Sequence, residues 1–235
     1  MAPLHLKSLE DGRQLFAKCS LFRGLQDNER ANLANRARIK DFAAGETIFL
    51  MGSAGNSMMA VLSGTVRISI PSPEGREIVL AILHSGEVFG EIALLDGKER
   101  TADAKAVTPC SLAILTRNDV LTFLERTPTS WPKLVEVLCE RLRRTDQQIA
   151  EVALLQLPAR LAKALLRIAA DEPLPKGDEF KHKVRLSQRE LGNFVGATRE
   201  SVNKAMGHFR HQGWISVKDG SIVILDADAL RGLCS

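Results

Sequence analysis

A glycine, two charged residues and a hydroxyl lie at close spacing in the segment FGEIALLDGKERTADAKA, residues 89–106. Gly90 lets backbone N–H groups approach an anion closely, and the free amides of a short helix after it would point at that anion. Arg100 can form a charge-assisted pair with a phosphate, and Thr101 adds a hydroxyl donor. Glu91 only accepts hydrogen bonds when ionised, so it suits a sugar hydroxyl instead. The segment predicts a site for a phosphate with a nearby sugar hydroxyl; the alternative is a glycine turn with a surface Glu–Arg pair.

The composition limits the class of protein. At 235 residues the chain is long enough for two modest domains. No apolar run approaches the roughly 18–20 residues of a membrane span, and the opening MAPLHLKSLEDGRQLF carries acids where a signal peptide needs an apolar core. The four cysteines lie far apart, without CxxC spacing or a His cluster, so we expect no metal and no iron–sulfur cluster. A cytoplasmic protein with no membrane partner is expected.

Excess positive charge is confined to the C-terminal third of the chain. Residues 1–157 carry equal numbers of basic and acidic side chains, so the whole net charge of +4 lies in residues 158–235. This excess is a modest footprint for a polyanionic partner, and it supports one only in combination with a motif.

The middle of the chain alternates short apolar runs with Gly, Pro and Ser breaks. Many short strands with frequent glycine turns favour an antiparallel β-roll or jelly roll. A metal enzyme of the cupin type could use such a barrel, but it would need a His and Glu cluster on the strands. The region offers only His84, so no enzyme is expected. Helices are expected over residues 9–17 and 28–37, and strands over 47–50, 58–63, 65–70, 78–83, 102–106 and 111–115.

A long helix follows between Pro128 and Pro158, with a hinge expected at residues 157–159. Seven positions in this helix recur at spacings of four and three, which is an a/d seam. Because further leucines line another face, we expect one face on the barrel and the other on a second copy in a homodimer. A polar residue at Thr145 breaks the seam, either to set the dimer register or to serve a ligand. The seam comprises Trp131, Val135, Leu138, Leu142, Thr145, Ile149 and Val152.

Residues 186–215 predict a helix, a tight turn and a second helix. Ser187 with Glu190 forms a capping box, Gly196 ends the first helix, and Thr198 can cap the second. Such a helix-turn-helix places its second helix in the major groove of DNA, and the hairpin pattern after it predicts a wing. The alternative is a solvated helix face. The expected base contacts are Arg199, Glu200, Asn203 and Lys204, and the expected phosphate contacts are Ser187, Gln188, Arg189 and Thr198.

Together these motifs resemble the CRP/FNR family of transcription regulators, from about residue 21 to 225. The pattern FGE-(apolar)-x-L-L…R-[ST]-A resembles the family's phosphate-binding cassette, and Arg199 and Glu200 match its base-reading pair. Lys204 stands where the family often has Arg, which keeps the charge but loses the bidentate fork. The resemblance implies an α+β fold: an N-terminal antiparallel β-roll (jelly-roll) cyclic-nucleotide-binding domain over 1–127, a long dimerisation helix and hinge over 128–157, and a C-terminal winged helix-turn-helix domain over 158–235.

The resemblance also implies a cyclic nucleotide as allosteric effector. cAMP is expected, with cGMP or both as alternatives because Thr101 replaces the serine usual in bacterial cAMP-binding members. Thr145 and Asp146, from either chain of the dimer, match the position over the purine, although a hydroxyl residue usually stands where Asp146 does. The predicted nucleotide contacts are Gly90, Glu91, Ile92, Ala93, Arg100, Thr101, Arg141, Thr145 and Asp146.

The implied function is control of transcription. Nucleotide binding would place two recognition helices on successive major grooves of a palindromic double-stranded DNA operator, with G·C-containing half-sites similar to TGTGA and RNA polymerase as a further partner. The alternative keeps the DNA reader without the cyclic nucleotide: a regulator that is nucleotide-independent or senses another small ligand.

Overall fold

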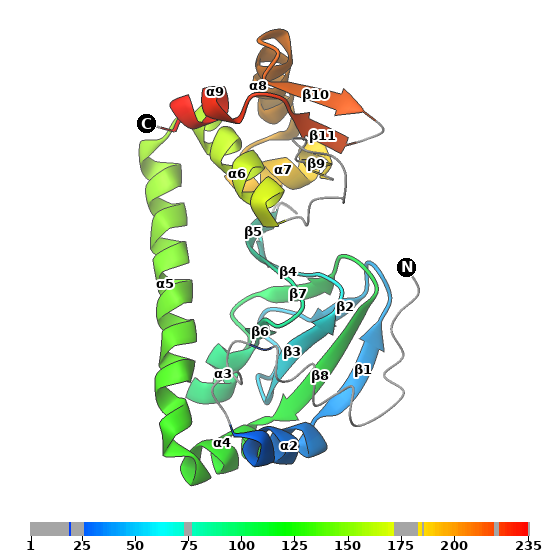
Figure 1. Cartoon of the computed structure of the whole chain (residues 1–235), viewed down its shortest axis with the longest axis vertical. Coiled ribbons are helices and arrows are strands. Elements are labelled where there is room, and N and C mark those ends of the chain that lie inside the picture. Colours follow the sequence, from blue (N-terminus) through cyan, green and yellow to red (C-terminus); the bar gives the residue numbers. More distant parts are fainter. Residues whose placement is uncertain are drawn as a thin grey trace. The chain divides into compact units, whose positions relative to one another are not determined.

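The structure is a computed structural model that describes residue 19 and residues 26–72, 77–171, 183–184, 186–218 and 221–234. The chain divides into two compact units, Met1–Arg143 and Arg144–Ser235, and the long helix α5 (Trp131–Leu154) crosses the boundary between them (Figure 1). The helix expected over residues 9–17 lies outside the described residues.

Two four-stranded antiparallel sheets form the body of the first unit (Figure 1). The strand order is β1-β8-β3-β6 in one sheet and β2-β7-β4-β5 in the other. This arrangement confirms the expected antiparallel roll, and the six expected strands are present to within one or two residues at each end. The strands are β1 (Arg38–Phe42), β2 (Thr47–Phe49), β3 (Ser57–Ser63), β4 (Val66–Pro71), β5 (Glu77–Leu83), β6 (Val88–Phe89), β7 (Asp103–Ala106) and β8 (Cys110–Thr116).

Strand β3 is buried on both faces, which explains its unbroken apolar sequence. Because successive side chains on a strand point to opposite faces, Met59 and Val61 pack into the core between the two sheets. Met58 and Leu62 belong instead to a second core, which the helices of this unit cover. Each such buried side chain stabilises the fold by about 1.5–3 kcal/mol. Strand β3 therefore contributes to both cores of the roll, and it also carries part of the candidate site.

Helices α2 (Asp27–Arg36), α3 (Glu91–Asp96) and α4 (Arg117–Arg126) belong to the first unit, and a 3₁₀ turn (Pro128–Ser130) leads into α5. Helix α4 follows β8 directly and was not expected. The hydroxyl of Thr116 caps it by accepting from the Asp119 N–H at 3.3 Å. The Asp119 carboxylate also pairs with Arg36 of α2 at 3.3 Å, which fastens α2 to α4.

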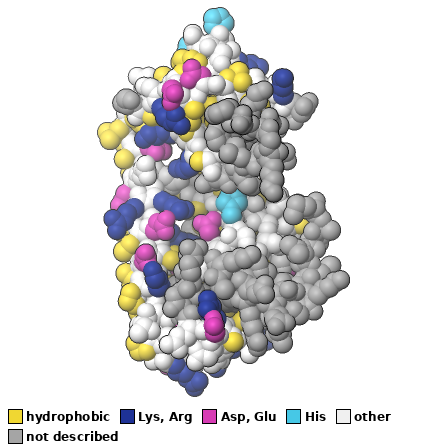
Figure 2. All heavy atoms as spheres, viewed as in Figure 1, with side chains coloured by type: hydrophobic (Ala, Val, Ile, Leu, Met, Phe, Trp, Pro, Cys, Tyr) yellow, Lys and Arg dark blue, Asp and Glu magenta, His cyan; other side chains and the backbone are white. Residues whose placement is uncertain are grey.

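Helix α5 has one covered face and one apolar face exposed. Leu134 is buried in the helix-covered core. On the exposed face, which we call the α5 seam, Leu142 and Ile149 are each 62% exposed and Val152 is 56% exposed. Figure 2 shows hydrophobic side chains along the left edge of the molecule, where Figure 1 draws this helix. The predicted two-faced helix is present, and its pairing with a second copy stays a prediction.

The second unit is a helix-turn-helix domain with a three-stranded wing of order β10-β11-β9. Leu161, Leu191, Val202 and Phe209 are each 0% exposed and belong to its single core. The expected winged helix-turn-helix is confirmed, and a short C-terminal helix follows the wing. The elements are α6 (Leu157–Asp171), β9 (Lys183–Val184), α7 (Gln188–Val195), α8 (Arg199–His211), β10 (Ile215–Lys218), β11 (Ser221–Ile224) and α9 (Ala227–Gly232).

The expected hinge position is wrong by two residues. Helix α5 ends at Leu154, and residues 157–159 already form the first turn of α6. Pro158 therefore begins a helix rather than ending one, since the first turn needs no N–H from that residue. The break lies at residues 155–156, where the Lys163 ammonium of α6 approaches the Glu151 carboxylate of α5 at 3.6 Å.

Candidate functional site

The corner between β6 and α3 is built around Gly90. This residue is the N-cap of α3 and has a left-handed backbone with φ of 78°. A Cβ atom placed there would lie 2.5 Å from Nη1 of Arg100. Both the dihedral angle and the close approach of Arg100 therefore require glycine, while the predicted approach of the backbone to a phosphate stays a prediction.

The guanidinium of Arg100 is held rigidly beside this corner, with the residue only 4% exposed. Its Nη1 donates to the Gly90 carbonyl at 2.8 Å and its Nη2 donates to the Ser57 hydroxyl at 2.9 Å. The guanidinium carbon lies 4.2 Å from the centre of the Phe49 ring, a cation–π contact. Burial lowers the pKa of Arg100, and the Glu91 carboxylate opposes that shift. Within the described residues, the buried Nε atom has no hydrogen-bond partner.

The carboxylate of Glu91 is 0% exposed and faces a second arginine. Its Oε1 lies 2.8 Å from Nη1 of Arg141 on α5, whose Nη2 donates to the Val88 carbonyl. Burial raises the pKa of the Glu91 carboxyl, while Arg141, its own backbone and Arg100 each lower it. The buried carboxylate is therefore held mainly by its ion pair with Arg141.

The predicted nucleotide contacts therefore separate into three groups. Gly90, Glu91, Arg100 and Arg141 lie together, and we call these four residues the cassette cluster. Thr101 and Ile92 are exposed beside it, whereas Ala93 of α3 is buried at 3%. The remaining pair, Thr145 and Asp146, is exposed on the part of α5 that belongs to the second unit, and its contact with a nucleotide stays a prediction.

Two residues at the cluster were missed by sequence reasoning. Ser57 and Phe49 lie on β3 and β2, more than forty residues before Arg100, and only the folded sheets bring them to it. Neither residue forms part of a local motif. The one available signal is the position of Ser57, a polar residue that begins a strand whose five inner residues are apolar.

The helix-turn-helix has the capping that its sequence predicts. The Ser187 hydroxyl accepts from the Glu190 N–H at 3.2 Å, and the Ser187 N–H donates to the Glu190 carboxylate at 2.8 Å. Gly196 ends α7 in the left-handed region, and the Thr198 hydroxyl accepts from the Ser201 N–H at 3.2 Å. These bonds fix the first turns of both α7 and α8.

The predicted base contacts share one exposed face of α8. Val202 and Phe209 of this helix are buried in the core of the second unit. The residues on the opposite side extend into solvent, as a helix that enters a DNA groove requires. The exposed set is Arg199, Glu200, Asn203 and Lys204, joined by Ser187, Arg189 and Thr198, while Gln188 is half-buried.

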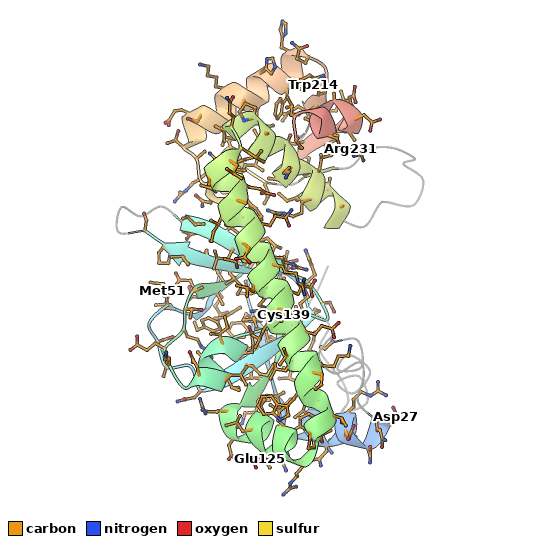
Figure 3. The ribbon with its side chains drawn as sticks, turned by 90° about the vertical axis from the view of Figure 1, so that its left-hand side faces the viewer. Asp27, Met51, Glu125, Cys139, Trp214 and Arg231 are labelled. Atoms are coloured by element: carbon orange, nitrogen blue, oxygen red, sulfur yellow. The ribbon has the colours of Figure 1, made fainter. Side chains whose placement is uncertain are left out.

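Trp214 connects the reading helix to the wing (Figure 3). Its backbone N–H donates to the Phe209 carbonyl at 3.0 Å, and its backbone carbonyl accepts from the Leu225 N–H at 2.8 Å. The indole also packs edge-on against His208, with ring centres 5.7 Å apart. The wing is thereby held in a fixed position relative to the end of α8.

Three further observations concern the part of the chain that the structure describes. No group of three His, Cys, Asp or Glu side chains there could hold a metal ion. No described helix is both long and apolar enough to cross a membrane. Burial raises the pKa of the Cys19 thiol to about 12, so that thiol stays protonated.

Comparisons with known proteins match both halves of the chain. Residues 39–127 match the cyclic nucleotide-binding domain, and residues 159–233 match the Crp-like helix-turn-helix domain. A CRP-like cAMP-activated global transcriptional regulator of Mycobacterium tuberculosis is 32% identical over 92% of this chain and 97% of its own length. The cyclic AMP receptor protein of Thermus thermophilus is 31% identical over 90% of this chain and 94% of its own.

Solved structures show the same architecture. A CRP/FNR-family transcription regulator from Thermus thermophilus superposes with a TM-score of 0.72 at 31% identity, over 84% of this chain and 98% of the other. A c-di-GMP responsive global regulator from Xanthomonas campestris has a TM-score of 0.75 at 21% identity, over 85% of this chain and 99% of its own. The second likeness concerns the fold alone.

Proposed function

Because the chain belongs to the CRP/FNR family of transcription regulators, we propose that it binds a palindromic DNA operator as a homodimer under the control of a cyclic nucleotide. Relatives that are cAMP-activated or cAMP receptors make cAMP the first candidate effector and cGMP the second. RNA polymerase is a further partner in this proposal. The family is one of regulators rather than enzymes, and a protein that reads DNA would act in the cytoplasm.

The observation that carries the nucleotide site is a pair of buried, incompletely bonded charges in the cassette cluster. Nε of Arg100 is buried without a hydrogen bond from the described residues, and the carboxylate of Glu91 is 0% exposed with Arg141 as its ion-pair partner. Leaving a buried polar atom without a partner costs about 1–3 kcal/mol. A phosphate oxygen suits the Arg100 donor, and a ribose hydroxyl suits the Glu91 acceptor, so one cyclic nucleotide would satisfy both.

The DNA half of the proposal is supported by the exposed face of α8. Arg199 can donate to guanine N7 and O6, and Glu200 can accept from cytosine N4. Both residues lie in the first turn of α8, the part of a recognition helix that meets base edges. Ser187 and Thr198 stand at the N-termini of α7 and α8, where backbone N–H groups can contact phosphates.

The homodimer is supported by the α5 seam. Leu142, Ile149 and Val152 form an exposed apolar face whose spacing suits a second copy of the same helix. Two recognition helices related by a twofold axis would then contact half-sites about 34 Å apart. A nucleotide can favour that arrangement only if it binds the DNA-competent state more tightly than the other state.

A second candidate is a regulator that does not need the cyclic nucleotide. The observation that favours it is that the cassette cluster is already partly bonded by the protein. Arg100 has the Gly90 carbonyl and the Ser57 hydroxyl as partners, and Glu91 faces Arg141. Such a cluster could stabilise the roll without a ligand.

Calorimetric titration of the full-length protein with cAMP, cGMP and non-cyclic AMP separates the two candidates. The first predicts saturable binding of a cyclic nucleotide, with non-cyclic AMP much weaker. Arg100→Lys, which keeps the charge but loses the bidentate fork, should weaken that binding. If the wild-type protein is correctly folded and neither cyclic nucleotide produces a heat of binding, the proposed effector is contradicted and the second candidate is favoured.

A further inference from the structure

Two residues that the sequence assigned to different contacts are joined by one hydrogen bond. Nε2 of Gln188 on α7 donates to Oδ1 of Asn203 on α8 at 3.1 Å. Gln188 was expected to contact a phosphate and Asn203 to read a base. The bond commits one end of each carboxamide to the other residue.

The frame around this bond is fixed. Gln188 is the first residue of α7, directly after the N-cap Ser187 and inside the capping box. Helix α7 packs against the turn that precedes α8, because a Cβ placed at Gly192 would lie 2.7 Å from the Ala197 carbonyl oxygen, and Leu191 of α7 shares a buried core with Val202 of α8. The start of α7 is therefore held against α8 by backbone packing and capping, whether or not the side-chain bond forms. The Gln188–Asn203 hydrogen bond therefore orients the Asn203 side chain and is not needed to keep the two helices packed.

Asn203 lies on the face of α8 that carries the predicted base-reading pair. It stands four residues after Arg199 and three after Glu200, and these spacings bring helical side chains onto one face. Asn203 is exposed, while its neighbour Val202 is 0% exposed. A carboxamide at this position can reach a base edge next to those read by the pair.

A carboxamide has an accepting end and a donating end, and its orientation decides which base it suits. Bidentate recognition of adenine needs both ends, since the oxygen accepts from N6 and the nitrogen donates to N7. With Oδ1 of Asn203 turned toward Gln188, Nδ2 is the end that faces the groove. That end suits edges rich in acceptors: guanine, with N7 and O6, or thymine, with O4.

We propose that Gln188 is a positioning residue that sets the base preference of Asn203. It turns the Asn203 amide nitrogen toward the DNA groove, so that guanine or thymine is preferred over adenine at one position of each half-site. This inference rests on the proposed DNA-binding function and adds a specificity determinant to it.

The test exchanges the donor on Gln188 for an acceptor of the same length. Gln188→Glu can only accept, so Asn203 must turn its nitrogen toward α7 and present its oxygen to the groove. Selection of bound duplexes from a randomised DNA library, with cAMP present, reads the preference at every position. In Gln188→Glu, one position per half-site should shift from guanine or thymine toward adenine or cytosine, which carry amino donors. The shift should be about fivefold or more in the base ratio.

Further variants distinguish the effect of Asn203 orientation from the effect of the negative charge that Gln188→Glu adds. Gln188→Ala should relax the same position without reversing it, because Asn203 can then turn either way. Asn193→Asp adds the same negative charge to α7 away from the bond, and it should keep the wild-type preference. In an Asn203→Ala background, Gln188→Glu should no longer change any base ratio, as a pairwise coupling requires.

Two results would overturn the inference. One is an unchanged base ratio at every position in both Gln188 variants, with a clear wild-type consensus. The other is a uniform loss of affinity for all sequences in Gln188→Glu, which would indicate charge repulsion from phosphates alone. A wild type that enriches no sequence would instead overturn the proposed function itself, and this inference with it. Thermal melting of each variant shows whether it is folded.

Discussion

The two candidate sites use charge in opposite ways. In the cassette cluster, Arg100 is 4% exposed and Glu91 is 0% exposed, and each is held by fixed neighbours. On α8, Arg199, Glu200 and Lys204 extend into solvent. Buried charges interact strongly but are expensive to leave unpaired, whereas exposed charges are weakened by water and salt. Under the proposed function, a ligand would meet fixed buried charges in the first site and exposed side chains in the second.

Removal of the buried Arg100 guanidinium should have the largest effect of the changes at the two sites. Arg100→Leu deletes the cation that would meet the phosphate and also leaves the Glu91 carboxylate with less compensation. A charge-assisted hydrogen bond contributes about 1.5–3 kcal/mol, so the loss of the one to the phosphate should weaken cyclic nucleotide binding about 10–150-fold. Calorimetric titration measures it. An affinity equal to that of the wild type would show that the nucleotide does not use this cluster.

A matched change on the exposed site should have a smaller and more selective effect. Arg199→Ala should lower affinity for a selected operator by about 1–3 kcal/mol and relax the preference at one base pair. Arg210→Ala removes an exposed arginine from the last turn of the same helix and should leave the base preference unchanged. Binding to the operator and to random duplexes measures both. Equal losses on the two DNAs in Arg199→Ala would contradict base reading.

The hydroxyl behind Arg100 allows a finer test of the buried site. Ser57→Ala removes the acceptor for Nη2, which leaves the guanidinium less well oriented. The expected loss is about 1 kcal/mol, or roughly fivefold in nucleotide affinity. Ser63→Ala, at the other end of β3, is the matched control and should bind like the wild type. If the two serine variants behave alike, Ser57 does not orient the arginine.

The smallest expected effect is the pH dependence of the buried carboxyl. Burial raises the pKa of Glu91 above its value in the unfolded chain. The folded protein therefore binds a proton that the unfolded chain lacks, in the pH range just above the ordinary pKa of a glutamate. Stability from this group rises as pH falls through that range and is lost as pH rises. In urea unfolding, the stability of wild type relative to Glu91→Gln should increase as pH falls from neutral; a flat or reversed difference would contradict the burial effect.

Local motifs were the part of the fold that sequence could predict. The glycine corner at Gly90 and the caps at Ser187 and Thr198 depend on residues within a few positions of each other, and the structure confirms them. Helix α4 had such a signal as well, since Thr116 precedes Asp119 by three residues as in a capped helix. That signal was overlooked.

Other features depend on contacts that a linear pattern does not contain. Strand β1 has four exposed residues out of five, so no apolar alternation marks it. Ser57 reaches Arg100 only through the sheet, and Gln188 meets Asn203 only because α7 and α8 pack closely. The sequence therefore predicted which residues carry charge, but not which residues orient them.

The central claim is that a cyclic nucleotide in the cassette cluster controls how tightly α8 binds DNA. The most direct test is the affinity for a selected operator with and without cAMP, in wild type and in Arg100→Leu. We expect cAMP to tighten operator binding by wild type about 5–150-fold, the usual range of allosteric coupling, and to have no effect on Arg100→Leu. Equal operator affinity with and without either cyclic nucleotide, or an undiminished response in Arg100→Leu, would contradict it.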